Sequence, residues 1–249
     1  MHAPHPPLRK YYLEESDRGR WVKQIFDRTA TDYDRIERVM ALGSGSLYRK
    51  KALLRAGLKP GMRVLDIGVG TGLTARQAAR LVGESGRVTG IDPSSGMMQS
   101  AKVPAGVELL LGSAENIPAS SETADFLCMG YALRHVTDLA LAFGEFLRVL
   151  KPGGRICLME ITRPQGRVSR AVLKAYMHRI VPFLAGMLGA NHESPELMRY
   201  YWDTIDACVP PSEILAAIRD AGFVDAYRHV EMGIFSEYCA RKPTVQDAA

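Results

Sequence analysis

From position 57 onward, short apolar runs rich in Val, Ile and Leu alternate with segments whose apolar residues recur at helical spacing. The apolar runs predict strands, because β-branched residues favour extended backbone that is buried on both faces. A regular alternation of strand and helix predicts a parallel sheet with helices on both sides. We expect the strands at 63–67, 87–91, 107–111, 125–129, 155–161, 225–231 and 234–240.

The last two of these strands are separated by too few residues for a helix, so we expect an antiparallel hairpin there. Two helical regions lie outside the alternation, one before the first strand and one after the fifth. Together these patterns predict a flexible arm (1–20), an N-terminal helical lid (21–56), a Rossmann-like core (57–163), a helical insertion (164–210), a C-terminal helix and strand pair of the core (211–241) and a tail (242–249).

The longest apolar stretch, 171–190, lies in the helical insertion and contains Lys174, His178, Arg179 and Pro182. A membrane-spanning helix needs about 20 predominantly apolar residues with few charges, so the pattern excludes one here. An amphipathic helix that Pro182 can kink fits better. We predict that this segment either covers a substrate pocket or contacts a membrane surface, where Lys174 and Arg179 would favour anionic lipid.

Composition narrows the range of partners. The chain of 249 residues carries 32 Lys and Arg against 27 Asp and Glu, a net charge of +5. These basic residues are scattered, so we expect no nucleic-acid partner. Residues 1–10 lack the apolar run of a signal peptide. No metal or redox spacing relates the cysteines, which predicts a reducing, cytoplasmic location; they are Cys128, Cys157, Cys208 and Cys239.

The first predicted strand ends at Asp66 and runs into a loop with Gly68, Gly70 and Gly72 at every second position. Glycines let the backbone turn sharply and approach a ligand closely. The following helix N-terminus favours an anionic group. A dinucleotide fingerprint would need its third Gly at the position of Leu73, and no Lys-Ser/Thr pair of an ATP-binding loop follows. The spacing therefore disfavours a nicotinamide dehydrogenase and an ATPase.

Other candidate residues follow the neighbouring strands. Asp92 stands 20 residues after Gly72, where a carboxylate at the end of the second strand can accept hydrogen bonds from both ribose hydroxyls. Turns at 113–116 and 130–136 follow the third and fourth strands. Ligands of such sheets bind outside the carboxyl ends of the strands. These features predict one ligand site at that edge of the sheet.

The loop pattern Asp-x-Gly-x-Gly-x-Gly resembles the first motif of the class I S-adenosylmethionine-dependent methyltransferases. Over residues 26–164 the chain resembles the ubiquinone/menaquinone biosynthesis C-methyltransferase family more closely, and the segment Leu133-Arg134-His135-Val136-Thr137-Asp138 is its more specific mark. The other matching segments are Phe26-Asp27 with Tyr33-Asp34, 64–66 with the glycine loop, Asp92, 114–118 and 148–154.

This resemblance implies a fold and a cofactor. The fold would be an α/β, doubly wound, Rossmann-like sheet of seven strands in the order 3-2-1-4-5-7-6, with the last strand antiparallel and the helical insertion on the acceptor side. The cofactor would be S-adenosyl-L-methionine, and no metal would be required. The residues expected to bind the cofactor are Tyr33, Asp66, Gly68, Gly70, Thr71, Gly72, Asp92, Pro93, Ser113, Ala114, Glu115, Met129 and Gly130.

Three positions depart from the family's usual residues. Ser113 stands where the family more often has Asp or Asn, and Gly130 replaces its usual Ser. His135 replaces its usual Asn in the turn that is expected to face the methyl acceptor. The acceptor is therefore less well defined by the resemblance than the cofactor.

Methyl transfer from a sulfonium chiefly requires that nucleophile, methyl group and sulfur be aligned. A phenolic acceptor must also lose a proton. His135 has a suitable unperturbed pKa for that task, and Arg134 could stabilise the phenolate through a charge-assisted hydrogen bond. We predict His135, Arg134 and Tyr131 as the catalytic residues. In the alternative, His135 only orients the acceptor by hydrogen bonding.

The leading hypothesis is therefore an enzyme that methylates a small hydrophobic aromatic acceptor, with the carbon of a quinol- or phenol-like ring as the target that the family indicates. O- or N-methylation of a natural product or phospholipid headgroup would use the same cofactor-binding half of the protein. A cofactor-binding regulator with a degenerate acceptor site is the non-enzymatic alternative. We expect an aromatic or lipid-like small molecule as partner, and we allow for a homodimer.

Overall fold

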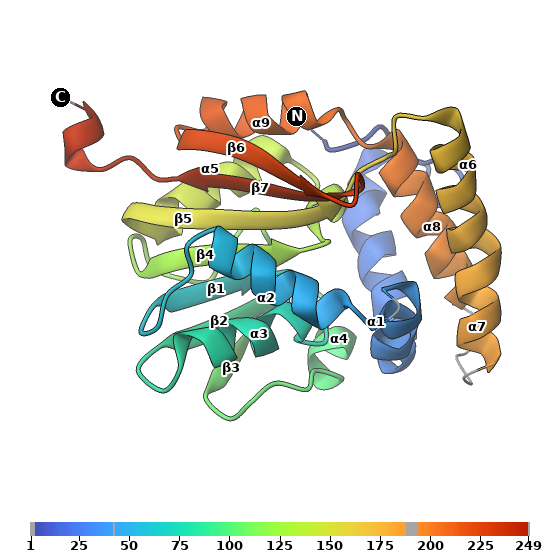
Figure 1. Cartoon of the computed structure of the whole chain (residues 1–249), viewed down its shortest axis with the longest axis horizontal. Helices are drawn as coiled ribbons and strands as arrows, with labels where there is room; N and C mark the ends of the chain where they lie inside the picture. Colours follow the sequence, from blue (N-terminus) through green and yellow to red (C-terminus); the bar gives the residue numbers. More distant parts are fainter. Residues whose placement is uncertain (1–2, 42, 188–193, 249) are drawn as a thin grey trace.

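The computed structural model describes residues 3–41, 43–187 and 194–248. Its centre is a seven-stranded sheet with the strand order β3-β2-β1-β4-β5-β7-β6, as the resemblance implies (Figure 1). The strands are β1 (Arg63–Ile67), β2 (Arg87–Asp92), β3 (Val107–Leu111), β4 (Ala124–Gly130), β5 (Leu150–Ile161), β6 (Val224–Glu231) and β7 (Phe235–Arg241).

Strand pairing follows the expected pattern. The pairs β1–β2, β2–β3, β1–β4 and β4–β5 are parallel. Strand β7 runs antiparallel to both β5 and β6. β5 begins at Leu150 rather than at the predicted position 155, because the buried Leu150 pairs with Ala124 before the Gly153–Gly154 turn is complete.

Helices cover both faces of the sheet. On one face, α2 (Gly45–Arg55) and α3 (Leu73–Val82) pack on β-strand residues such as Val64 and Phe126. On the other face, α5 (Leu139–Val149) and α9 (Pro211–Asp220) pack on the next residue of each strand, Leu65 and Leu127. Alternate strand residues therefore feed two separate cores, as a doubly wound fold requires.

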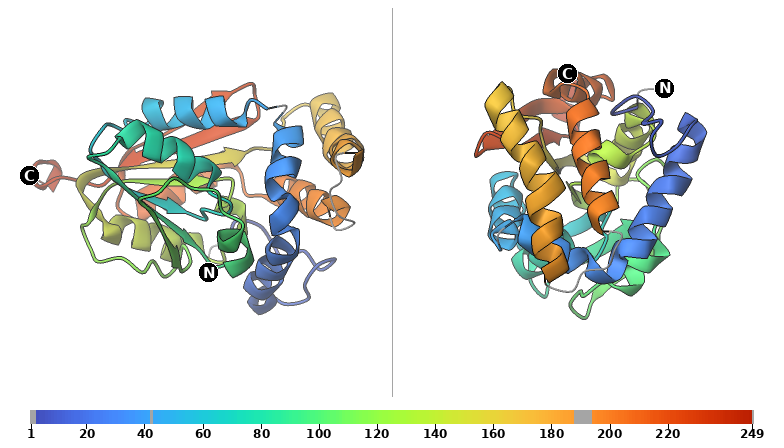
Figure 2. Two further views of the ribbon diagram at one scale, coloured as in Figure 1. Left: turned by 90° about the horizontal axis from the view of Figure 1, so that it is seen from below. Right: turned by 90° about the vertical axis from the view of Figure 1, so that its right-hand side faces the viewer.

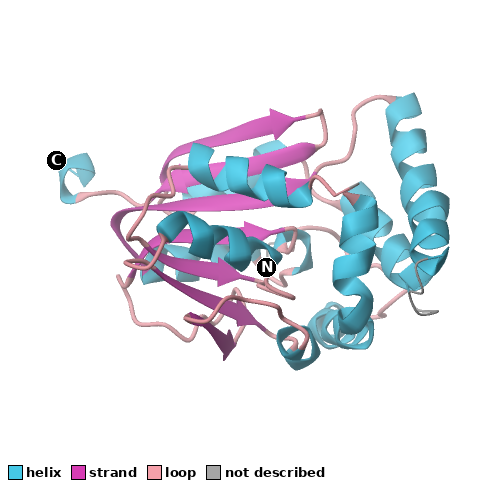
Figure 3. Ribbon diagram, turned by 60° about the horizontal axis from the view of Figure 1, so that its bottom comes forward, coloured by secondary structure: helices cyan, strands magenta, loops and turns pink. Residues whose placement is uncertain are grey.

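A group of helices lies beyond the carboxyl ends of the parallel strands, which are the ends that carry the arrowheads in Figure 3. It consists of α1 (Arg18–Met40), α6 (Arg167–Ala175), a π-helical segment η3 (Tyr176–Ile180), α7 (Val181–Met187) and α8 (Ser194–Ala207), here called the helical cap (Figure 2). Its helices share a third apolar core. The remaining short helices are η1 (Glu15–Asp17), α4 (Ser95–Gln99), η2 (Leu133–His135) and η4 (Val245–Ala248).

The segment before α1 packs on the body of the protein instead of forming the flexible arm expected for 1–20. The Pro4 carbonyl accepts a hydrogen bond of 2.8 Å from the Val209 amide. Arg18 is fully buried and donates to the carbonyls of His5 and Val136, at 2.6 and 3.1 Å. A buried guanidinium needs several acceptors, so Arg18 holds this segment against the turn after β4.

The stretch 171–190 is interrupted where Pro182 allows a kink, since η3 separates α6 from α7 just before that proline. Positions 188–190 of the stretch lie outside the described residues. Met177, Val181 and Ala185 are buried in the cap core, while other apolar side chains of the stretch are exposed. Within the described chain, no helix is long and apolar enough to cross a membrane.

Candidate active site

A cavity of about 420 Å³ lies at the carboxyl ends of β1, β2 and β4, under α1. Most of the residues predicted from the sequence line it. They are Tyr33, Gly68, Gly70, Thr71, Asp92, Pro93, Ser113, Ala114, Glu115, Met129, Gly130, Tyr131 and His135. Asp66, Gly72 and Arg134 do not line the cavity.

The glycine loop approaches the cavity with its backbone. Gly68 and Gly70 both have positive φ, +68° and +53°, where a side chain would be strained. A Cβ on Gly68 would lie 2.6 Å from the Cβ of Ala132, so the loop and the turn after β4 can only meet here without a side chain. The amides of Gly68 and Val69 bond the Ile91 carbonyl at 2.8 and 3.1 Å, which ties the loop to β2.

Asp66 and Gly72 support this loop from behind. Burial raises the pKa of Asp66 to about 7, although the Cys128 thiol donates to its Oδ1 at 3.5 Å. The other oxygen, Oδ2, is buried and has no hydrogen-bond partner among the described residues. Gly72 has no room for a Cβ, because Val103 packs against its Cα.

The Asp92 carboxylate lines the cavity, and the protein fills only half of its hydrogen-bond acceptor positions. Its Oδ2 accepts the Gly70 amide and its Oδ1 accepts the Ser94 amide, both at 2.8 Å. A carboxylate oxygen accepts two hydrogen bonds, so each oxygen keeps one lone pair for a ligand. Burial raises the pKa of Asp92 to about 6 in spite of the two amides.

The turn after β3 is fixed to the turn after β4. Ser113 and Asn116 bond each other through their backbones at 3.3 Å. The Glu115 carboxylate accepts the amide and the hydroxyl of Thr137, at 2.6 and 2.8 Å. Glu115 therefore lines the cavity but uses one of its oxygens to position Thr137.

Helix α1 closes over the cavity through two aspartates whose roles the sequence alone did not reveal. Asp27 accepts the Ser94 hydroxyl at 2.6 Å and the Gly96 amide at 3.0 Å. Asp34 accepts the Thr71 hydroxyl and forms an ion pair of 3.4 Å with Arg76. These contacts hold the helix on the glycine loop and on the segment after β2. The matching segments Phe26-Asp27 and Tyr33-Asp34 were the only sequence signal for them.

Gly130, one of the departures from the family pattern, has a structural partner. A Cβ at this position would meet the hydroxyl of Thr74, which also lines the cavity. The space of a side chain at 130 is thus occupied by Thr74 of α3. Tyr131 follows with a positive φ of +63°, and its ring lies under the Arg49 guanidinium at 5.1 Å. Strained backbone of this kind concentrates at functional sites.

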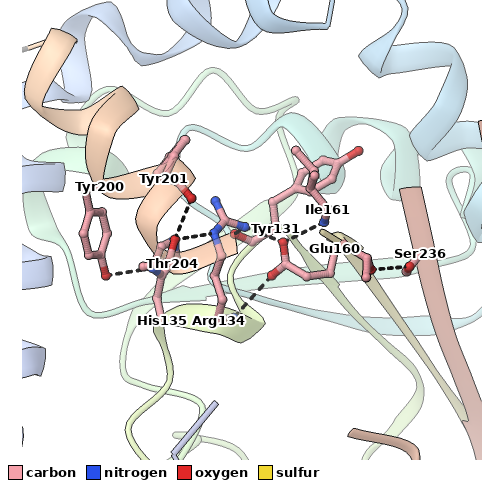
Figure 4. A network of polar contacts seen from close by, with 10 residues as sticks. Tyr131, Arg134, His135, Glu160, Ile161, Tyr200, Tyr201, Thr204 and Ser236 are labelled. Carbon is pink, nitrogen blue, oxygen red and sulfur yellow. Dashed lines mark hydrogen bonds and ion pairs between the residues drawn. The ribbon is translucent and has the colours of Figure 1, made fainter. Parts of the chain in front are cut away.

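Arg134 does not reach the cavity, contrary to its predicted role next to the acceptor. Its guanidinium is buried in an ion pair with Glu160 and donates to Thr204 Oγ1 at 3.1 Å and to the Tyr131 carbonyl at 2.9 Å (Figure 4). It also lies over the Tyr201 ring, 4.8 Å from the centroid. The sequence motif gave no sign of Glu160, because the partner stands 26 residues away on β5.

His135 does line the cavity, with Nδ1 3.0 Å from the Tyr200 hydroxyl (Figure 4). Phe26 of α1 contacts the imidazole edge-on, with ring centroids 5.3 Å apart. Burial lowers the pKa of His135 well below its ordinary value, and the nearby charges of Arg134 and Arg18 lower it further. The ring is therefore neutral at physiological pH.

A doubly wound sheet in this strand order, with a glycine loop after β1 and a carboxylate after β2, defines the fold of S-adenosylmethionine-dependent methyltransferases. One solved structure of this class, from Aquifex aeolicus, aligns with a TM-score of 0.61 at 24% identity and covers 84% of this chain and 97% of that one. Phosphoethanolamine N-methyltransferase 2 of Haemonchus contortus, solved with S-adenosyl-L-methionine, aligns with a TM-score of 0.58 at 19% identity, covering 79% of this chain and 52% of that one.

The family is given by the sequence comparison. The model of the ubiE/COQ5 methyltransferase family matches residues 13–242, and the chain belongs to this family. The ubiquinone/menaquinone biosynthesis C-methyltransferase UbiE of Campylobacter jejuni is 31% identical over 231 residues, 89% of this chain and 97% of its own. The enzyme of that name from Pseudomonas putida is 31% identical over 239 residues, 93% and 92% of the two chains. The protein is thus a methyltransferase that uses S-adenosylmethionine.

The residues at the site fit this cofactor. The free lone pairs of Asp92 suit two ribose hydroxyls, and Gly68 and Gly70 line the cavity with backbone alone. The unpartnered Oδ2 of Asp66 lies behind the loop and does not line the cavity. The apolar Ala114 and Met97 offer walls for an adenine ring. When bound, the cofactor supplies a methyl group on a positively charged sulfur.

Proposed function

We propose that this protein methylates a ring carbon of a hydroxylated aromatic acceptor that carries an apolar tail, in the biosynthesis of a quinone. The names of its relatives indicate such an acceptor. The observation that carries the proposal is the composition of the cavity wall that α1 and the turn after β4 form. That wall is aromatic and aliphatic, formed by Val22, Phe26, Tyr33, Tyr131, His135 and Val136.

Aromatic walls suit a flat ring, because ring pairs in edge-on or offset contact stabilise each other beyond simple burial. The only basic groups that line this part of the cavity already have partners in the described structure. Lys23 bonds Asp27 at 2.6 Å, and Arg49 bonds Glu37 at 2.7 Å. A phosphorylated headgroup would need a free cationic group, so this site favours an uncharged ring over the phospholipid alternative.

The chain contributes positioning and exclusion of water rather than covalent chemistry. In this proposal the glycine loop and Asp92 hold the methyl donor, and Tyr131 and His135, which line the same cavity, contact the acceptor ring. Alignment of this kind can contribute about 7–11 kcal/mol in favourable intramolecular reactions. Closure of α1 by Asp27 and Asp34 removes bulk water, which strengthens the electrostatic interactions of a phenolate inside.

The experiment is a transfer assay with the purified full chain and S-adenosylmethionine. The acceptors are a reduced naphthoquinol and a reduced benzoquinol with one unsubstituted ring position, a catechol, and phosphoethanolamine. We expect the mass of one added methyl group only with the quinols, and NMR should place that methyl on ring carbon. A methyl on oxygen or nitrogen would support the alternative acceptors. Binding of S-adenosylhomocysteine without any transfer would support a regulator.

A further inference from the structure

Tyr200 of α8 holds the imidazole of His135 at the cavity wall (Figure 4). The two rings stack with centroids 5.3 Å apart and an interplanar angle of 23°, and the hydroxyl lies 3.0 Å from Nδ1. The other ring nitrogen, Nε2, is buried and has no hydrogen-bond partner within the described chain. A buried polar atom without a partner is costly, so its presence on a cavity residue indicates a ligand.

The contact with Tyr200 decides whether Nε2 can accept or donate. A neutral imidazole carries one proton, and the nitrogen without it is an acceptor. A phenol is a strong donor and a weak acceptor, and Nδ1 is the one partner that the described structure gives the Tyr200 hydroxyl. The hydroxyl therefore donates to Nδ1. The imidazole proton then resides on Nε2, which makes Nε2–H a donor.

We infer that Tyr200 is a positioning residue that fixes His135 in the Nε2-protonated tautomer, so that His135 donates a hydrogen bond to the ring oxygen of the acceptor instead of removing its proton. This inference rests on the proposed function and deepens it, because it names the group that recognises the acceptor oxygen. The hydroxyl proton of the acceptor passes to solvent water as the acceptor enters, before α1 closes, and Nε2–H donates to the oxygen that has lost it.

The surrounding charges agree with this role. A general base at position 135 would become an imidazolium beside the buried guanidiniums of Arg134 and Arg18, which also lower the pKa of His135. The imidazole of His5 also lies near His135, and burial lowers the pKa of His5 to about 4. The two guanidiniums oppose a new positive charge but favour a phenolate. The Asn that is usual in the family at this position can donate through its amide in the same way.

The direct test is NMR of the ligand-free protein labelled with ¹⁵N-histidine. The signals of His135 are assigned by their loss in His135→Asn, and the ring nitrogen shifts report which nitrogen carries the proton. We expect a neutral ring protonated at Nε2 throughout pH 6–8. In Tyr200→Phe this preference should be lost. Tyr11→Phe is the matched control, since Tyr11 contacts the Tyr200 ring edge-on but bonds Asp203. A ring protonated at Nδ1, or one that titrates within this range, overturns the inference.

Kinetic measurements test the inference independently. His135→Asn keeps a donor, so we expect its kcat within about tenfold of the parent, whereas His135→Ala should lose about 10²-fold or more. Tyr200→Phe should raise the acceptor KM and leave cofactor binding unchanged. Equal losses of kcat in His135→Asn and His135→Ala would overturn a donor role, provided that the acidic limb of the pH–rate profile shifts in neither variant. If no quinol is methylated while Nε2 protonation still depends on Tyr200, the proposed function fails and the positioning role stands.

Discussion

At the scale of single residues, the buried carboxylate of Asp92 should make cofactor binding depend on pH, while Asp66 affects only the stability of the fold. Burial raises the pKa of Asp66 to about 7 and that of Asp92 to about 6, so both carry protons in the ligand-free protein near pH 5. Of the two, only Asp92 lines the cavity, and hydroxyl donors of the cofactor bind its ionised form more strongly, so binding should release the Asp92 proton. We expect affinity for S-adenosylhomocysteine to rise from about pH 5 to about pH 7.

Calorimetry in two buffers of different ionisation enthalpy measures this proton release directly. The stability of the ligand-free protein should change in the opposite sense. A raised carboxyl pKa contributes stability at low pH, and this contribution is lost as pH rises through about 6 and about 7. Asp92→Asn is the control, because it should remove the step near pH 6 and leave the one near pH 7. Binding that is independent of pH in this range would contradict the prediction.

At the scale of elements, α1 is held over the site by Asp27 and Asp34. Burial alone would raise the pKa of Asp27, but hydrogen bonds from Lys23, Ser94 and Gly96 lower it overall. These contacts are therefore present at neutral pH. Asp34→Ala removes charge-assisted hydrogen bonds to Thr71 and Arg76, which are worth about 1.5–3 kcal/mol.

We expect Asp34→Ala to release S-adenosylhomocysteine roughly tenfold faster or more and to speed amide hydrogen exchange along α1. Asp17→Ala is the matched control, because the one side-chain contact that the described residues give Asp17 is an exposed ion pair of 3.3 Å with Arg20 at the start of the same helix. Stopped-flow dissociation and exchange mass spectrometry measure the two effects. If both variants behave alike, closure of α1 does not depend on this contact.

The stretch from α6 to α7 exposes apolar residues that the packing of the fold does not require. Its outward apolar residues are between 46% and 78% exposed, and they are Val168, Val172, Ile180, Phe183 and Met187. From 164 to 187 the sequence contains no Asp or Glu but includes Arg167, Lys174 and Arg179. An exposed apolar face flanked by basic residues alone is complementary to an anionic bilayer. We propose that this face, called the α6–α7 face, docks on such a membrane.

Sedimentation with vesicles tests this proposal. We expect the full chain to bind vesicles rich in phosphatidylglycerol more strongly than phosphatidylcholine vesicles, and to lose that binding in the double variant Val172→Glu, Phe183→Glu. Leu141→Glu is the control, since Leu141 is 60% exposed on α5, which is not part of the helical cap. If the double variant instead dissociates a dimer and binds vesicles as before, the α6–α7 face is a contact between copies of this chain.

At the scale of the whole molecule, the cofactor half could be predicted from the sequence because its signals are local. The glycine loop, Asp92 and the strand-end turns each follow one apolar run, and the alternation of strand and helix brings those ends together. The acceptor half depends on contacts between distant segments. Tyr200 meets His135 only because α8 returns to the carboxyl edge of the sheet, and no spacing in the sequence encodes that return.

Contacts between distant segments also explain why the sequence wrongly predicted that Arg134 acts on the acceptor. Its motif lies beside the site, but its charge is neutralised by Glu160 at the carboxyl end of β5, a partner 26 residues away in the sequence. Through this pair the turn after β4, the sheet and α8 are joined, since Arg134 also binds Thr204 and Glu160 accepts the Ile161 amide at 2.8 Å. The pair thus connects the helical cap to the core of the fold.

Removal of one partner should therefore destabilise the whole protein. Glu160→Ala leaves a buried guanidinium without its counter-charge, and we expect it to lower the free energy of unfolding by about 3–5 kcal/mol. The double variant Arg134→Met, Glu160→Leu replaces the pair by apolar groups and should recover most of this loss. Urea unfolding measures both at one pH. Recovery of stability together with measurable methyl transfer would make Arg134 a structural residue. A double variant that is stable and binds S-adenosylhomocysteine, yet transfers no methyl group, would instead restore the catalytic role predicted from the motif.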